Sequence, residues 1–253
     1  MTSASPDRRI RLDELLVRRG LFASRSRARD AVLRGAINHD GATAAKPGQT
    51  VPDKALLAVD DPARAYVSRA ALKLVAALDH FGLDPSNRAA LDIGASTGGF
   101  VQVLLERGAR SVVAVDVGHG QLHPRLAGDP RVKSIEGLNA RDLSLAGIGG
   151  VAPGFVTCDA SFISLRLVLP PALELAAPGA AGIFLVKPQF EAGREAIGKG
   201  GLLRDQDEGE RSAARLRDWL DGLPGWRALG LVPSPIEGGD GNREFLLGGI
   251  KDR

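Results

Sequence analysis

The chain has 253 residues, of which 44% are hydrophobic and 25% are charged, and its formal net charge is +3. This composition indicates a globular protein of one or two domains, with a core large enough to need no disulfide or metal. The single cysteine, Cys158, excludes an intramolecular disulfide framework and a thiolate metal cluster, so a reducing, cytoplasmic location is expected. No secretory signal is recognisable, and no stretch approaches about 18 consecutive apolar residues, so no membrane span is expected.

Positive charge is concentrated in the first quarter of the chain. Residues 1–66 hold 12 Lys and Arg against 8 Asp and Glu, whereas residues 67–253 hold 21 against 22. A basic segment ahead of a near-neutral body favours binding of a polyanion. The alternative is a solvated helix face in an arginine-rich chain, because Arg outnumbers Lys 26 to 7 throughout.

The basic segment is expected to form a small α+β unit. Leucine spacing predicts a first helix between Leu12 and Gly20, and Ser24 is a plausible N-cap for a second helix that ends near Gly35. Short strands are expected near Ile37 and over 56–59, before a linker that begins at Asp60. The side of the second helix opposite its apolar face carries arginines: Arg25, Arg27, Arg29 and Arg34.

From about Val67 the sequence alternates apolar runs with helical patterns. The runs that read as buried strands are Ala89–Ile93, Ser111–Val117, Phe155–Cys158 and Gly182–Val186. Helices are expected over Phe100–Arg107, Pro170–Ala177 and Glu208–Leu220, and late strands over Leu229–Val232 and Glu244–Leu247. Strand and helix alternation of this kind predicts an α/β fold with a doubly wound sheet.

A glycine-rich turn follows the first of these strands. It reads Asp92-Ile93-Gly94-Ala95-Ser96-Thr97-Gly98-Gly99-Phe100, and Asp116 closes the next strand candidate. Ligands of doubly wound sheets bind at the carboxyl ends of such strands, where glycines allow close approach to the backbone and an acid can accept hydrogen bonds from ribose. Asp142, near the expected third strand, is either an adenine ligand or a helix N-cap.

The glycine spacing discriminates between nucleotide sites. It differs from the G-x-G-x-x-G of dinucleotide-binding turns, and no Gly-Lys-Ser/Thr of a P-loop occurs. The motif with its downstream acid resembles the S-adenosylmethionine loop of class I methyltransferases. That resemblance implies cofactor contacts from Asp92, Gly94, Ala95, Ser96, Gly98, Gly99, Phe100, Asp116 and Asp142.

Four further polar residues stand beside the predicted strands. Asp159 and Lys187 each follow a buried run, Glu244 precedes the last strand candidate, and Lys73 lies in a helix before the first. A lysine that closes a buried apolar run needs an anionic partner or a catalytic task. The residues alone leave two interpretations open: salt bridges at the sheet edge, or proton transfer by a lysine. Lysine suits proton transfer because its surroundings can lower its pKa, whereas arginine stays protonated.

In the same chain order, Lys73, Asp159, Lys187 and Glu244 resemble the Lys-Asp-Lys-Glu tetrad of FtsJ-type ribose 2′-O-methyltransferases. The N-terminal segment resembles an S4-type RNA-binding domain in Arg11-Leu12-Asp13-Glu14-Leu15-Leu16 and Ser24-Arg25-Ser26-Arg27-Ala28. From about Arg11 to Leu247 the chain is therefore similar to the TlyA, or hemolysin A, family of ribosomal RNA methyltransferases.

This resemblance implies an S4-type domain over 8–60, a linker over 61–67, and a Rossmann-like class I methyltransferase domain over 68–253. It implies catalysis by the four tetrad residues, with S-adenosylmethionine as cofactor and no metal or membrane. Ribosomal RNA or ribosomal subunits would be the partner, and the enzyme would methylate a ribose, expected to be that of a cytidine in 16S and/or 23S rRNA. RNA contacts are implied for Arg11, Arg25, Arg29 and Arg64, the last in a linker that couples RNA and cofactor binding in that family.

Two other functions remain open at the level of sequence. One is a non-catalytic RNA-binding or ribosome-assembly factor that keeps an inherited cofactor fold, although none of the four tetrad positions is lost. The other is a membrane-lytic protein, as the name hemolysin suggests, acting without a spanning segment through an amphipathic surface helix.

Overall fold

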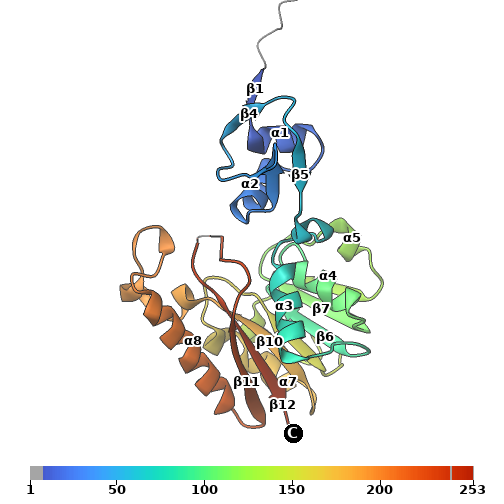
Figure 1. The fold of residues 1–253 in the computed structure, drawn as a ribbon. Helices are drawn as coiled ribbons and strands as arrows, with labels where there is room; N and C mark the ends of the chain where they lie inside the picture. Colours follow the sequence, from blue (N-terminus) through green and yellow to red (C-terminus); the bar gives the residue numbers. More distant parts are fainter. Residues whose placement is uncertain (1–7, 240, 253) are drawn as a thin grey trace, which may run out of the picture. The chain divides into compact units, whose positions relative to one another are not determined.

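The computed structural model describes residues 8–239 and 241–252. The chain divides into two compact units, Met1–Ala65 and Tyr66–Arg253, and each has its own apolar core (Figure 1). The boundary lies inside the segment 61–67 predicted as a linker, of which Pro62–Ala65 forms a short 3-10 helix. Within the described ranges, no helix is both long and apolar enough to cross a membrane.

The N-terminal unit is a small α+β structure. Its elements are β1 (Arg9–Arg11), α1 (Leu12–Arg18), α2 (Arg25–Leu33), β2 (Ile37–His39), β3 (Ala42–Thr43), β4 (Thr50–Pro52) and β5 (Leu57–Val59). Strand β2 pairs antiparallel with β3 and β5, and β1 pairs antiparallel with β4. The leucines of α1 and the apolar face of α2 bury their side chains in one core with the strands.

Both predicted helices of this unit are confirmed, together with their ends. The Ser24 side chain accepts a hydrogen bond from the Arg27 amide at 3.3 Å, as an N-cap does. Gly35 has a φ of +74°, the left-handed conformation that ends many helices. The sequence did not predict β1 and β4, because each is three residues long with one buried apolar residue, Ile10 or Val51, and so carries no periodic signal.

The C-terminal unit is built on one seven-stranded sheet. Its strands are β6 (Ala89–Ile93), β7 (Ser111–Asp116), β8 (Val132–Glu136), β9 (Phe155–Cys158), β10 (Ala181–Val186), β11 (Trp226–Pro233) and β12 (Phe245–Lys251). Their order in the sheet is β11-β12-β10-β9-β6-β7-β8, and β12 runs antiparallel to the other strands. The predicted doubly wound α/β sheet is thus confirmed, with longer late strands than the sequence indicated.

Helices cover both faces of this sheet (Figure 1). One face is packed by α3 (Ala71–Phe81), α4 (Gly99–Glu106) and α5 (Pro124–Ala127), and the other by α6 (Leu165–Val168), α7 (Pro170–Leu175) and α8 (Gln206–Asp221). Successive side chains of a strand point to opposite faces, so in β10 Ile183 joins the first layer and Phe184 the second. Burial on both faces explains why the central strands read as continuous apolar runs.

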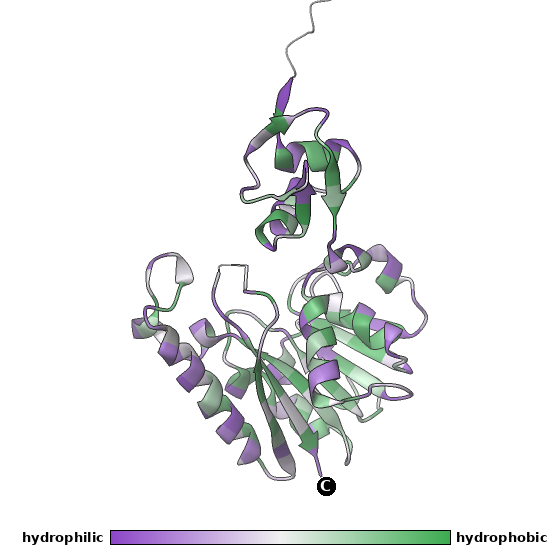
Figure 2. Ribbon diagram, in the orientation of Figure 1, coloured by the Kyte–Doolittle hydropathy of each residue, from purple (hydrophilic) through white to green (hydrophobic). Residues whose placement is uncertain are grey.

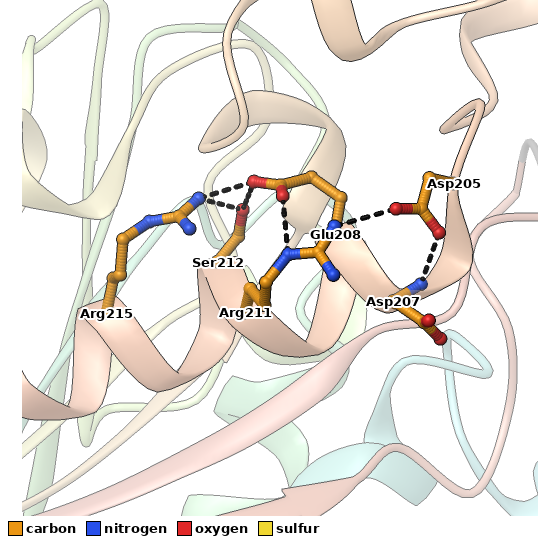
Figure 3. Close-up of polar contacts among 6 residues, drawn as sticks. All are labelled: Asp205, Asp207, Glu208, Arg211, Ser212 and Arg215. Carbon is orange, nitrogen blue, oxygen red and sulfur yellow. Dashed lines mark hydrogen bonds and ion pairs between the residues drawn. The ribbon is translucent and has the colours of Figure 1, made fainter.

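Helix α8 shows how an amphipathic segment lies on the sheet. Ala213, Leu216 and Leu220 are buried in the core, whereas the rest of its surface is strongly hydrophilic (Figure 2). On the exposed side Arg211 bonds Asp205, which caps the helix, and both Arg211 and Arg215 bond Glu208 (Figure 3). Exposed pairs of this kind contribute little to stability, so burial of the apolar face holds the helix in place.

The strand order fixes where a ligand can bind. Strand β6 lies between β7 and β9, and the chain runs outward from it in opposite directions along the sheet. At such a switch point the connections leave to different faces, which opens a crevice beyond the carboxyl ends of the strands. The glycine turn after β6, Asp116 at the end of β7, Asp159 after β9 and Lys187 after β10 all lie at this edge.

Candidate functional site

The glycine turn is shaped by contacts within the protein. Gly94 has a φ of +77°, and a Cβ atom there would lie 2.8 Å from the Asp159 carbonyl oxygen. A Cβ at Gly98 would collide with the side chains of Leu122 and Leu126, and one at Gly99 would lie 3.0 Å from Ser68 Cβ. The glycines were expected to admit a ligand to the backbone, but their visible role is to let the turn, α4 and the β9 loop pack closely.

Asp116 ties the turn to the neighbouring strand. Its carboxylate accepts hydrogen bonds from the amides of Ser96 and Gly118, each at 2.7 Å. Ser96 has a φ of +46°, a left-handed conformation that is uncommon outside glycine and that often accompanies functional sites. Each carboxylate oxygen keeps a further lone pair, so Asp116 can still accept hydrogen bonds from a ligand.

A cavity of about 460 Å³, here called the large cavity, lies beside this turn. Of the predicted cofactor residues, Gly94, Ser96 and Asp116 line it. Most of its remaining wall is apolar, with few polar groups, as in sites for small organic ligands. Its other lining residues are Ile93, Val115, Val117, Gln121, Leu138, Asn139, Ala140, Asp159, Ala160, Ser161, Phe162, Ile163 and Val168.

Asp92 is not among the residues that line this cavity, and its role as a cofactor contact stays a prediction. It is completely buried, and one of its carboxylate oxygens accepts a hydrogen bond from Thr157 Oγ1 at 2.7 Å, across the β6–β9 pair. The other oxygen has no hydrogen-bond partner among the described residues. Burial raises the pKa of Asp92 to about 7, although the Thr157 hydrogen bond opposes the rise. Asp92 therefore joins two strands from inside the core.

Asp142 is also outside the large cavity. It is the last residue of a 3-10 helix, Ala140–Asp142, and its side chain is exposed. The N-cap of that helix is Asn139, whose side chain accepts a hydrogen bond from the Arg141 amide, so the alternative N-cap role of Asp142 is wrong. Asn139 and Ala140 line the cavity where Asp142 was expected to.

The four tetrad residues form two lysine–carboxylate pairs. Lys187 Nζ lies 2.6 Å from Asp159 Oδ1, and Lys73 forms an ion pair and hydrogen bond with Glu244. Lys73 is in the first turn of α3 and Glu244 directly precedes β12, so the tertiary fold joins residues 171 positions apart. Burial raises the pKa of Glu244, and the nearby Lys73 ammonium opposes that rise.

Two further cavities adjoin the pairs. A small cavity of about 170 Å³ is lined by Asp159 and Lys187 and, on the side of the turn, by Gly94, Ala95, Ser96, Gly99 and Phe100. A side cavity of about 420 Å³ is lined by Lys187 and Glu244, together with the glycine-rich segment that includes Gly200 and Gly201. Gly98 and Lys73 are among the lining residues of none of the three cavities. Lys187 thus lies where two spaces meet.

Two negative findings bear on the chemistry. Burial raises the pKa of Cys158 to about 12, so this residue stays a thiol, as expected for a small core side chain. Among the described residues, no three His, Cys, Asp or Glu side chains are grouped as a metal site requires.

Sequence reasoning missed several residues that line the site. It selected charged residues at strand ends and passed over their uncharged neighbours, such as Ser161 after β9 and Gln121 and Asn139 in the connections beyond β7 and β8. Ser161 borders all three cavities. The signal that could have found these residues is their position, because the segments that follow the parallel strands around a switch point border the crevice.

The predicted RNA-binding arginines lie in the N-terminal unit. The fully buried carboxylate of Asp13 bonds Arg11 at 2.9 Å and Arg25 at 3.2 Å. Burial by itself would raise the pKa of Asp13, but hydrogen bonds from the two guanidinium groups outweigh it, and the net pKa is lowered. Arg29 is exposed on α2, and Arg64 lies over the Phe22 ring at 5.7 Å. The fold thus brings Arg11 and Arg25 together.

Residues 66–251 match the FtsJ-like methyltransferase family. The chain is 46% identical over 241 residues to a Mycobacterium tuberculosis protein named 16S/23S rRNA (cytidine-2′-O)-methyltransferase TlyA, with 95% of this chain and 89% of the relative covered. It is 37% identical to Hemolysin A of Brachyspira hyodysenteriae, with 94% of this chain and 98% of the relative covered.

A solved structure gives the same result. A candidate hemolysin from Streptococcus thermophilus matches with a TM-score of 0.73 at 40% identity, covering 97% of this chain and 90% of that one. These matches and the strand order confirm the predicted Rossmann-like class I methyltransferase fold. The chain belongs to the FtsJ-like methyltransferase family, among the relatives that carry the names TlyA and Hemolysin A.

Proposed function

We propose that this protein uses S-adenosylmethionine to methylate the 2′-hydroxyl of a ribose, that of a cytidine in 16S or 23S ribosomal RNA. The observation that carries the proposal is the position of Lys187, paired with Asp159 at 2.6 Å and bordering both the small cavity and the side cavity. The small cavity shares Gly94, Ser96, Asp159 and Ser161 with the large cavity, so a lysine at that junction would reach a cofactor on one side and a substrate on the other. The RNA and the base follow the names of the relatives.

The large cavity suits the cofactor. Its volume of about 460 Å³ lies within the ~300–1,000 Å³ typical of small-molecule sites. Apolar side chains such as Leu138 and Val168 would contact the adenine ring, and Asp116 would accept hydrogen bonds from the ribose of the cofactor. Bound there, S-adenosylmethionine supplies an electrophilic methyl group on a sulfonium, which needs no metal.

The chain's own residues would prepare the nucleophile. A ribose hydroxyl in the side cavity is weakly nucleophilic until its proton is removed or oriented, and Lys187 would do this. Asp159 would hold the Lys187 amine, while Glu244, paired with Lys73, would line the side cavity. Fixing hydroxyl, methyl and sulfur in line would supply much of the acceleration.

The N-terminal unit would act as an S4-type domain that docks on folded RNA. Arg11 and Arg25, held on Asp13 with partly exposed guanidinium groups, and the exposed Arg29 would contact phosphates. We extend the same role to Arg64.

The experiment is transfer of tritiated methyl groups from S-adenosylmethionine to purified 30S subunits, 50S subunits and free rRNA, followed by alkaline digestion. A 2′-O-methyl group blocks cleavage at its ribose, so label in an alkali-resistant dinucleotide is the expected result and identifies the subunit. Label in a mononucleotide would move the chemistry to a base and refute the proposal. Cofactor binding without label on any substrate would favour the assembly-factor alternative.

A further inference from the structure

We propose that Ser161 is a positioning residue for Lys187. Lys187 Nζ donates a hydrogen bond to Ser161 Oγ at 2.7 Å, in addition to its ion pair with Asp159 at 2.6 Å. The inference rests on the proposed function, because it assigns to Ser161 a part in the proton transfer attributed to Lys187. Sequence reasoning did not select Ser161 as a site residue.

The surroundings of Ser161 point to this role. It borders the large, small and side cavities, and of their lining residues no other borders all three. Lys187 is 9% exposed and lies where the small and side cavities meet. Its long side chain has several rotamers, so contacts are needed to keep it in one of them. A hydroxyl and a carboxylate on the same loop restrain the ammonium from two directions.

The donor count explains what the restraint achieves. A neutral lysine amine has two N–H donors and one lone pair. Lys187 Nζ donates a hydrogen bond to Ser161 Oγ, and Asp159 Oδ1 lies 2.6 Å from Nζ as its ion-pair partner, so both N–H groups can be directed to protein oxygens. The lone pair would then accept the proton of the ribose hydroxyl, while the oxygen–methyl bond would form, the sulfur–methyl bond would break, and its electron pair would stay on sulfur. Asp159 and Ser161 then stabilise the resulting ammonium.

The loop that carries Ser161 is anchored independently at its far end. Glu191, in the segment after β10, accepts hydrogen bonds from Ser164 Oγ at 2.6 Å and from the Leu165 amide at 2.8 Å. Ser164 also caps α6 and lines none of the three cavities. Ser164 is therefore a matched control for Ser161, since both are serines of one loop that each make a side-chain hydrogen bond to the β10 segment.

The test compares Ser161→Ala, Ser161→Thr and Ser164→Ala in the full-length protein. Loss of one hydrogen bond to a charged group should lower kcat about 10-fold in Ser161→Ala, with RNA KM and cofactor Kd within about 2-fold of wild type. Ser161→Thr, which keeps the hydroxyl, should recover most of the loss. Ser164→Ala should keep kcat, with any effect confined to the melting temperature.

Three results would overturn the proposal. Unchanged kcat in Ser161→Ala would show that the hydrogen bond between Lys187 and Ser161 does not contribute to catalysis. An equal fall of kcat in both alanine variants would show a general loosening of the loop. A raised KM or Kd at constant kcat would make Ser161 a ligand contact instead. The alkali digest of the wild-type product tests the ribose assignment separately, because the kcat comparison holds wherever the methyl group is placed.

Discussion

Both units pair a buried carboxylate with cationic side chains, but the two units differ in which cation they use and in how exposed that cation is. In the N-terminal unit, Asp13 is completely buried while the side chains of Arg11 and Arg25 are 44% and 55% exposed. In the C-terminal unit, the side chains of Lys73 and Lys187 are only 7% and 11% exposed. The arginines present their charge to solvent, whereas the lysines keep theirs inside the site.

The difference between the cations fits the two proposed tasks, RNA binding and proton transfer. Arginine stays protonated and offers a rigid fork of donors, which suits lasting contact with phosphates. Lysine can exchange a proton when its surroundings favour the neutral form, which suits transfer from a hydroxyl. In a chain with 26 Arg and 7 Lys, the use of two lysines at this site fits the proposed proton transfer.

The largest expected effect comes from exchanging the cation at the site. Lys187→Arg keeps the positive charge beside Asp159 but cannot accept a proton, so methyl transfer should fall by about 10²–10⁴-fold, as it should in Lys187→Ala. Cofactor binding, measured by calorimetry, should remain near wild type in both variants.

A distant lysine provides the control. Lys133→Ala, on the exposed edge of β8, should leave methyl transfer unchanged. If Lys187→Arg were fully active, charge alone would suffice and the contrast between the units would lose its chemical basis. An equal loss of cofactor affinity would instead make Lys187 a cofactor ligand.

Asp92 extends the comparison to a buried carboxylate that forms no ion pair with any residue the structure describes. Burial raises its pKa from an ordinary 3.8 to about 7, so the folded state holds a proton that the unfolded chain releases. The stability that this bound proton gives the folded state is fully present below the unfolded pKa of Asp92 and is lost as pH rises through about 7. Asp92→Asn, which is always neutral, should therefore gain roughly 4 °C or more in melting temperature relative to wild type between pH 4.5 and pH 8.

Thermal melts of both proteins across that range give the measurement, and the comparison is made without cofactor. A constant difference at every pH would mean that Asp92 is ionised in the folded protein. The assignment of Asp92 to the interior would then need a cation that the structure does not show there.

The same residues show how far sequence reasoning reaches. Asp159, Lys187 and Glu244 could be selected because each adjoins a strand candidate, and a charge there needs a partner or a task. Their assignment to a catalytic tetrad with Lys73 came from the resemblance to the FtsJ-type enzymes. Which lysine pairs with which acid could not be predicted, because Lys73 and Glu244 meet only through the tertiary fold. The burial of Asp92 could not be predicted either, because it depends on the register across β6 and β9, which turns its side chain toward Thr157.

A substitution of Asp13 tests the exposed arginines of the N-terminal unit. Asp13→Asn removes the anion that pairs with Arg11 and Arg25. We expect the free energy of unfolding to fall by about 1–2 kcal/mol at neutral pH, a small value because solvent screens the two exposed guanidinium groups. The folded pKa of Asp13 is lowered, so its contribution is present above the unfolded pKa near 3.8 and disappears as pH falls through the lower folded value.

Hydrogen exchange of the α1 and α2 amides at pH 7 and at pH 3 would measure this effect. Protection should fall in Asp13→Asn at pH 7, and the difference between the two proteins should be smaller at pH 3, because the contribution of the carboxylate decreases below the unfolded pKa. Equal protection at pH 7 would show that the buried carboxylate does not organise the arginines.

The smallest effect separates an anchored arginine from a free one. Arg25 is held on Asp13, whereas Arg29 is exposed on the same helix and has no ion-pair partner among the described residues. If each contacts one phosphate, Arg25→Ala and Arg29→Ala should each reduce the salt dependence of RNA binding by roughly one unit of slope. Only Arg25→Ala should also reduce protection of α1, because only it leaves the Asp13 carboxylate with one partner fewer. If the salt dependence of RNA binding were unchanged in Arg29→Ala but reduced in Arg25→Ala, RNA contact would be confined to the arginines that Asp13 orients. The Asp13 carboxylate would then be the group that positions the RNA-binding arginines.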